Sequence, residues 1–217
     1  MCLAVRPIRK DAEWLAELLQ HGLLPSSFVP PRLIRDLRDL TRACASLSQE
    51  SSRLASRIQK VLEDANIKLA RVASETLGKS GTAMLEAIIA GQDDAVQLAN
   101  LARGLLRAKI LQLRLALAGL VREHHRFLLE RLLAQWRFVE QEIELLDERL
   151  EQVGRLDPEL AEAVARWDTA PGVDRVAGWG LVAEIGIEMA VFPSAAHLAS
   201  WGGMCILGQS AVGRCAH

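Results

Sequence analysis

The feature that most constrains this chain is a pair of segments in which apolar residues recur in alternating steps of four and three. The first segment contains Leu33, Leu37, Leu40, Cys44, Leu47, Ser51, Leu54, Ile58 and Val61. The second contains Trp136, Val139, Ile143, Leu146, Leu150 and Val153. This period places the apolar side chains in one narrow stripe along a helix. The pattern predicts a mainly α protein in which the two long helices form an antiparallel coiled-coil hairpin, a dimer through these helices, or both.

Helix signals also occur on either side of the heptads. Residues 11–24 have helical apolar spacing, with Asp11 as a candidate N-cap and Gly22 as the end of the helix. Short helices are expected near 69–77, 80–90 and 93–102, and the second long helix is expected to begin near Leu105. Residues 159–203 are expected to form a small C-terminal helical domain.

Charge is unevenly distributed along the chain, although the formal net charge of −1 gives no overall attraction to nucleic acid. Residues 32–71 contain nine Lys/Arg and five Asp/Glu, whereas residues 140–162 are acidic. A basic helix face can contact phosphates, or it can simply be a solvated surface. The candidate nucleic-acid-binding side chains are Arg32, Arg35, Arg38, Arg42, Arg53 and Arg57.

Several other classes of site find no support in the sequence. The four cysteines have no metal-ligand spacing and are expected to be free thiols in a reducing compartment. His124 and His125 are adjacent, so they are not the i, i+4 pair of a helical zinc site. No phosphate-binding or dinucleotide-binding fingerprint is found. No long uncharged apolar run occurs either, so we expect a cytoplasmic protein without a membrane contact.

The segment APGVDRVAGWGLVAEIG, residues 170–186, sets a tight turn before a helix rich in small residues. The turn resembles a helix-hairpin-helix, in which backbone N–H groups meet a nucleic-acid phosphate. Gly172 and Val173 would supply that contact. Asp174 occupies the position of the usual second glycine, where a carboxylate would repel phosphate. Close helix packing is the alternative interpretation of the segment.

Together these blocks carry a family resemblance. DAEWLAELLQHGLLPSSFVPP, IRDLRDLTR, QKVLEDANIKL, SGTAMLEAIIAG, REHHRFLLERLL, APGV and FPSAAHLASWGG occur in this order between about residue 10 and residue 214. They resemble the insertion-sequence transposases that pair a resolvase-like, ribonuclease-H-type domain with a serine-bearing C-terminal domain, now known as bridge-RNA-guided recombinases. The resemblance implies binding of DNA and a structured guide RNA, and strand exchange in DNA.

The resemblance also implies site residues. The family holds Mg²⁺ with four acidic residues, of which Asp11 matches the last, while Ile8 stands at the position of the third. The nucleophilic serine matches Ser210, with Ile206 in place of a family proline. One carboxylate does not assemble such a metal site. We therefore expect a fragment, cut at both ends, that is catalytically inactive alone and binds no metal by itself.

The implied organisation has three parts. Residues 1–30 would be a remnant of the resolvase-like domain, 31–156 a coiled-coil region with inserted short helices, and 157–217 an incomplete serine-bearing domain. The expected partners are DNA, guide RNA and further copies of the chain through the coiled coil. Two alternatives stay open: a non-catalytic helical scaffold, and an inhibitor that forms mixed dimers with full-length transposase.

Overall fold

The protein is described by a computed structural model that covers residues 8–23, 31–73 and 75–201. Within these ranges the chain forms helices and no strand, which confirms the mainly α prediction. The α-helices are α1 (Ile8–Gln20), α2 (Arg32–Asp64), α3 (Lys79–Ile89), α4 (Ala95–Asn100), α5 (Ile110–Ala116), α6 (Glu123–Leu156), α7 (Pro158–Asp168), α8 (Arg175–Ile185) and α9 (Ala195–Trp201). The 3₁₀ turns are η1 (Leu69–Arg71), η2 (Gly104–Lys109) and η3 (Met189–Val191).

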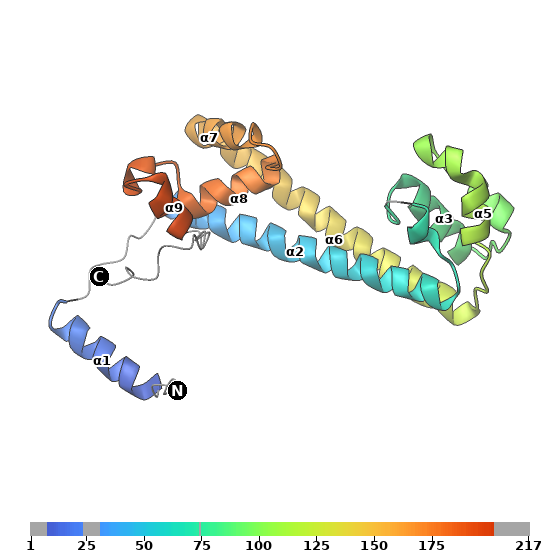
Figure 1. Cartoon of the computed structure of the whole chain (residues 1–217), viewed down its shortest axis with the longest axis horizontal. Helices are drawn as coiled ribbons and strands as arrows, with labels where there is room; N and C mark the ends of the chain where they lie inside the picture. Colours follow the sequence, from blue (N-terminus) through green and yellow to red (C-terminus); the bar gives the residue numbers. More distant parts are fainter. Residues whose placement is uncertain (1–7, 24–30, 74, 202–217) are drawn as a thin grey trace, which may run out of the picture.

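Helices α2 and α6 lie side by side in opposite directions and form the long axis of the molecule (Figure 1). Their heptad residues face each other: Leu37 and Leu54 are fully buried, and Leu150 is 1% exposed. The polar seam position Ser51 is satisfied by donating to a carboxylate oxygen of Glu140 and accepting from Trp136 Nε1 at 3.0 Å. The predicted antiparallel hairpin therefore forms within one chain, and the apolar seams of α2 and α6 pack against each other in it.

The short helices between α2 and α6 build one end of the hairpin, which we call the tip. Its core joins the C-terminal end of α2 to α3, α4, α5 and the start of α6. The prediction of one helix from Leu105 to Val153 is wrong, because the chain leaves the helix between α5 and α6. There Leu120 N–H donates to Ala65 O at 2.9 Å. A Cβ on Gly119 would lie 2.4 Å from the same oxygen, so this close approach needs glycine.

Helices α7 and α8 pack on the other end of the hairpin, which we call the base. Trp179 of α8 is 2% exposed and lies against Gly154, where a Cβ would meet the indole ring at 3.0 Å. The base core adds Leu37 and Cys44 from α2 to residues of α6, α7 and α8. At the base, residues that are far apart in the sequence thus hold the N-terminal part of α2 against the C-terminal end of α6.

Helix α1 stands apart from the hairpin (Figure 1). It begins at Ile8, so Asp11 lies in its first turn and is not the N-cap that the sequence suggested. Its end is as predicted: Gly22 has a φ of +63°, and Leu23 N–H donates to Leu18 O at 3.0 Å. The apolar residue Leu19 remains 69% exposed. Of the helices in the described ranges, none has the length and apolar character needed to cross a membrane.

Candidate nucleic-acid interface

The six candidate arginines lie along one side of α2. At about 100° per residue, their positions fall within an arc of about 120°, roughly opposite the seam that faces α6. From the first to the last they span about 38 Å at 1.5 Å per residue. We call this set the arginine strip: Arg32, Arg35, Arg38, Arg42, Arg53 and Arg57. Its length is enough to follow a nucleic-acid backbone past several phosphates.

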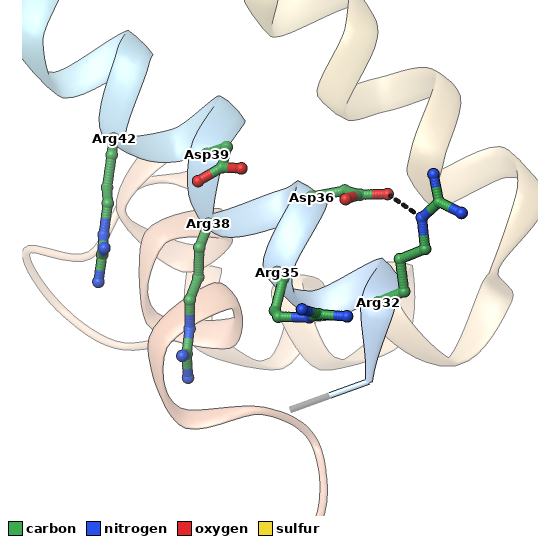
Figure 2. Close-up of a pocket in the computed structure, with 6 residues that line it drawn as sticks. All are labelled: Arg32, Arg35, Asp36, Arg38, Asp39 and Arg42. Atoms are coloured by element: carbon green, nitrogen blue, oxygen red, sulfur yellow. Dashed lines mark ion pairs between the residues drawn. The ribbon is translucent and has the colours of Figure 1, made fainter. Parts of the chain in front are cut away.

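The first turns of α2 form a shallow groove of about 400 Å³, lined by Arg32, Arg35, Asp36, Arg38, Asp39 and Arg42. Arg38 and Arg42 project in a similar direction from successive turns of the helix, whereas the Arg35 side chain turns toward Arg32 (Figure 2). Arg32 Nε lies 3.8 Å from an Asp36 carboxylate oxygen, and both side chains are well exposed. Among the ion pairs of the described residues, none includes Arg35. The guanidinium groups of Arg32 and Arg35 are therefore open to an anionic partner.

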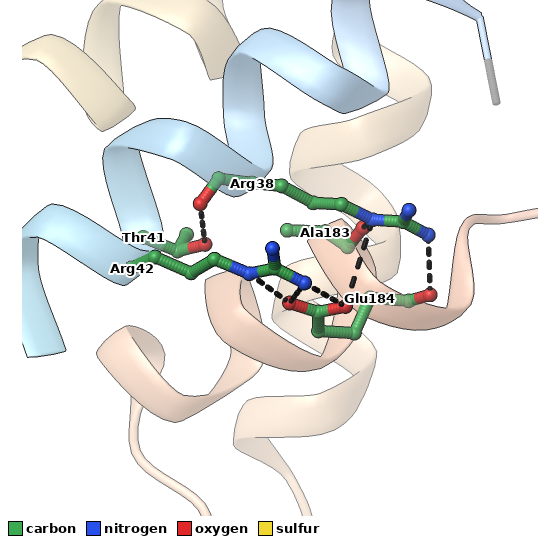
Figure 3. Close-up of polar contacts among 5 residues, drawn as sticks. All are labelled: Arg38, Thr41, Arg42, Ala183 and Glu184. Atoms are coloured by element: carbon green, nitrogen blue, oxygen red, sulfur yellow. Dashed lines mark hydrogen bonds and ion pairs between the residues drawn. The ribbon is translucent and has the colours of Figure 1, made fainter. Parts of the chain in front are cut away.

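Two members of the strip are already engaged with α8 (Figure 3). Arg38 donates from Nε to Ala183 O at 2.7 Å and from an amino group to Glu184 O at 2.8 Å. Arg42 binds the Glu184 carboxylate through two hydrogen bonds of 2.8 and 3.1 Å. Arg38 thus satisfies carbonyls at the C-terminal end of α8, where a cation is also favoured by the helix dipole.

We call Arg38, Arg42 and Glu184 the arginine clamp. The hydrogen bond from Arg42 to Glu184 raises the pKa of the Arg42 guanidinium, with a further contribution from the charge of Glu184. The Arg38 side chain is 23% exposed and that of Arg42 is 65% exposed. Glu184 was not predictable from the sequence because it is more than 140 residues from either arginine. No local pattern marks such a pair.

Farther along α2, the remaining arginines point to solvent. Arg53 forms an i, i+3 pair with Glu50, with a separation of 3.6 Å between charged atoms. Arg57 is exposed, and no ion pair of the described residues includes it. Pairs of this kind at a surface are weak and easily exchanged for another anion. The strip therefore contains the two arginines of the clamp, Arg38 and Arg42. The other four arginines are available to bind phosphate.

The turn before α8 contains Gly172, which is exposed, and Val173, which is half-buried. Gly172 has a φ of +83°, a conformation that favours glycine, and Val173 N–H donates to Ala170 O at 3.1 Å. Asp174 is the N-cap of α8, and its carboxylate accepts from Ala177 N–H at 2.8 Å. The capping carboxylate thus occupies the helix N-terminus at which a phosphate would bind.

Of the two candidate catalytic residues, Asp11 belongs to the described part of the chain. Asp11 is exposed on α1, away from the hairpin. Ser210 lies outside the described residues. In the described ranges, the group of three possible metal ligands that lie within 4.8 Å of one another consists of Asp64, His124 and His125, so Asp11 is not a member.

The Asp64–His124–His125 group sits at the tip, where α2 ends and α6 begins. His125 is buried, and its Nδ1 accepts a hydrogen bond from Arg122 N–H at 3.2 Å, which caps α6. The ring proton is therefore assigned to Nε2, which donates to Asp64 Oδ2 at 2.9 Å. This hydrogen bond lowers the pKa of the Asp64 carboxyl. Burial is the main cause of the lowered pKa of His124.

This arrangement does not fit Mg²⁺. Mg²⁺ prefers an octahedron of oxygen ligands, and only one of the three side chains offers oxygen. Both nitrogens of His125 are used by the cap and by Asp64, so coordination would break one of these hydrogen bonds. We interpret the group as a structural contact that holds the end of α2 against the start of α6.

Comparison with known proteins adds an independent observation. A family model described as Transposase matches residues 9–67, and a model described as Transposase IS116/IS110/IS902 family matches residues 165–213. No curated protein and no solved structure matches the chain. The first match contains α2 and the second contains α8, so the arginine clamp joins the two matched segments. Two segments of the chain that match transposase family models are thus packed against each other at the base of the hairpin.

Proposed function

We propose that this chain is the nucleic-acid-binding part of a transposase or recombinase, with DNA and a structured guide RNA as partners. The single observation that carries the proposal is the position of the arginine strip, which begins where the two transposase-matched segments meet. DNA recombination requires a surface that holds the phosphate backbone, and such contacts come mainly from arginine and lysine. In this proposal, residues 1–30, 31–156 and 157–217 keep the three domain roles that the resemblance implies.

The contacts are assigned to four exposed side chains, Arg32, Arg35, Arg53 and Arg57. Their partners within the chain are absent or weak, so a phosphate displaces little when it binds. Arg38 and Arg42 are assigned to the clamp, because binding a phosphate would break their contacts with α8. The carboxylates of Asp36 and Asp39 line the same groove and limit how closely a backbone approaches there.

Salt-dependent binding tests this assignment. The probes are a 30-base-pair DNA duplex and a hairpin RNA of similar length, measured by fluorescence anisotropy over a salt series. Replacing Arg32, Arg35, Arg53 and Arg57 by Ala should weaken binding and flatten the slope of log K against log salt, by about 0.9 for each lost DNA phosphate contact. A matched control replaces Arg131 and Arg166, which are exposed on other helices, and should leave the slope unchanged.

Catalysis is the second part of the proposal. Asp11 alone does not provide a metal site, so we infer that the chain does not cleave DNA by itself. The test incubates the protein with its cognate DNA end, Mg²⁺ and guide RNA. A covalent protein–DNA adduct that is lost in Ser210→Ala would overturn the inference.

A helical scaffold without nucleic-acid chemistry is the second candidate function, and the self-contained hairpin favours it. It predicts no retention of either probe at moderate salt, and no effect of the four arginine substitutions. An inhibitor of full-length transposase is its variant, and it predicts capture of an intact homologue in a pull-down. The proposed location is the cytoplasm for all three.

A further inference from the structure

The helical segment that runs from η2 into α5 carries a row of exposed apolar side chains at the tip. Leu105 is 95% exposed, Leu111 74% and Leu115 81%, and Ala108 between them is also exposed. Residues three apart are aligned in a 3₁₀ helix, and residues three or four apart are neighbours on an α-helix. These four residues therefore form one line about 17 Å long, which we call the tip row.

The tip row is contiguous and is not part of the tip core. The polar and charged residues of the same turns stand about 60–120° to either side of it; they are Arg107, Lys109, Gln112 and Arg114. The opposite side of the segment faces the tip core through Leu106, Ile110 and Leu113. A contiguous exposed apolar surface of this kind is typical of a binding site.

The surroundings of the tip row are cationic. Residues 95–122 contain five Lys/Arg and no Asp or Glu. Among the ion pairs of the described residues, none includes Arg107, Lys109 or Arg114. Lys109 Nζ donates to Val72 O at 3.2 Å, and the buried Nε of Arg114 has no acceptor within the described chain. A buried donor without an acceptor is rare in folded proteins. The cations beside the row therefore lack the carboxylates that would pair with them.

A hollow adjoins the Leu105 end of the tip row. It is a cavity of about 620 Å³, and Glu75 is the acidic member of its lining. The lining otherwise combines apolar and cationic side chains, among them Leu105, Leu106, Lys79, Arg103 and Lys109. A partner that fills this hollow would bring both apolar groups and negative charge.

The leucines, the cations and the hollow together favour one kind of partner. A nucleic-acid backbone offers phosphates to the cations and leaves the exposed leucines without an apolar contact. A lipid surface is flat on this scale and leaves the hollow unfilled. A helix of about three turns matches the length of the row, and its flanking carboxylates would reach Arg107, Lys109 and Arg114. We infer that the tip row binds an acidic amphipathic helix of another protein.

The first experiment uses a fluorescein-labelled synthetic peptide of about 20 residues, with Leu at every third or fourth position and Glu beside each Leu. Wild-type protein should bind it in fluorescence anisotropy. Leu111→Glu with Leu115→Glu should weaken binding at least about a hundredfold, because two carboxylates would be buried against the apolar side of the peptide. The control Leu19→Glu with Leu156→Glu changes leucines that are 69% and 82% exposed outside the tip, and it should bind like wild type.

All four leucines are exposed, so circular dichroism should show unchanged helix content in both double variants. A wild-type protein that does not bind the peptide would overturn the inference. Equal binding by the wild type and by the Leu111 and Leu115 variant would overturn it as well.

The second experiment tests the charge of the partner. A peptide with Lys in place of every Glu should bind the wild-type protein at least about tenfold more weakly. Arg107→Glu with Lys109→Glu should reverse this order, so that the Lys peptide binds more tightly than the Glu peptide. Equal binding of both peptides to the wild type would show that charge does not select the partner, and it would overturn the inference.

Two other occupants are tested with the same variants. Sedimentation with vesicles of phosphatidylserine and phosphatidylcholine measures lipid binding, and analytical ultracentrifugation measures self-association. If the Leu111 and Leu115 variant lost either of these while the wild type bound no peptide, the row would belong to lipid or to a second copy, and the inference would be overturned.

The tip row lies at the end of the hairpin away from the arginine clamp (Figure 1). None of these measurements includes nucleic acid. Failure here therefore leaves the proposed function untouched, and failed binding of the DNA and RNA probes leaves this inference untouched.

Discussion

The tip and the base of the hairpin differ in the size of their apolar cores. The tip core contains sixteen buried residues, all from the continuous stretch between Ile58 and Leu133. The base core contains nine: two are in α2, and the other seven lie between Leu150 and Ala183. The base adds polar contacts over long sequence distances: the arginine clamp, and a bidentate pair of Arg175 with Glu151. Side-chain hydrogen bonds occur at both ends, but the base has the smaller apolar core and therefore depends more on them.

This difference bears on function. Nucleic acid competes for guanidinium groups, and the base contains guanidinium groups that hold α8 in place. The tip also has arginine contacts between helices, since Arg126 of α6 donates to Ile88 O at 3.4 Å and pairs with Asp93, and Arg137 pairs with Glu86, but these contacts accompany the larger apolar core. We therefore expect the base to open more easily than the tip and to respond to anions.

The largest effect is expected from truncating the base tryptophan. Trp179→Ala removes a buried indole and should cost about 3–5 kcal/mol. Met84→Ala at the tip should cost about 2–5 kcal/mol. Calorimetry should show that the first substitution lowers a transition of the base and the second a transition of the tip. One common transition, shifted by both, would contradict two separate cores.

A smaller effect is expected from breaking the clamp. Arg38→Ala removes two charge-assisted hydrogen bonds to α8 carbonyls and should destabilise the base by about 1.5–3 kcal/mol. Arg35→Ala, one turn earlier on the same helix, should change stability by less than about 0.5 kcal/mol. Urea unfolding measures both. Equal effects of the two substitutions would show that the clamp does not hold α8.

The smallest effect concerns acid. The hydrogen bond from Arg175, with a weaker one from Trp179, lowers the pKa of Glu151, so this group stabilises the base above its unfolded pKa and the stability is lost as pH falls through the folded pKa. Both partners of the ion pair are more than one third exposed, so the loss should stay below about 1 kcal/mol. Unfolding between about pH 6 and pH 3 should be less pH-dependent in Glu151→Gln.

Asp64→Asn is the matched change at the tip, because the hydrogen bond from His125 also lowers the pKa of Asp64. It should reduce the acid sensitivity of the tip and leave that of the base unchanged. If Glu151→Gln altered the tip instead, the two ends would not respond to acid separately.

The parts of this structure that depend on local apolar periodicity were predictable from the sequence. The heptads in α2 and α6 predicted the hairpin because the spacing of seam residues such as Leu37 and Leu150 indicates which side chains are buried. The break at Gly119 was missed because its cause is a backbone contact with Ala65, on another element.

The candidate site follows the same division. Composition was enough to find the six arginines, since a basic run on a helix is visible in the sequence. Their separation into a clamp and a free group was not predictable, because Arg38 and Arg42 find Glu184 only in the folded chain. The role of Asp174 was predictable in part. The conflict between its carboxylate and a phosphate was expected from the sequence, and the structure shows that this carboxylate caps α8 by accepting from Ala177 N–H.

Native-state hydrogen exchange in low urea tests the difference between tip and base most directly. Amides of α7 and α8 should exchange through an opening of lower free energy than amides of α3 and of the α6 segment beside it. Arg38→Ala should lower that first opening further and leave the tip amides unchanged. Exchange of both ends with one common free energy, moved together by the substitution, would contradict the account.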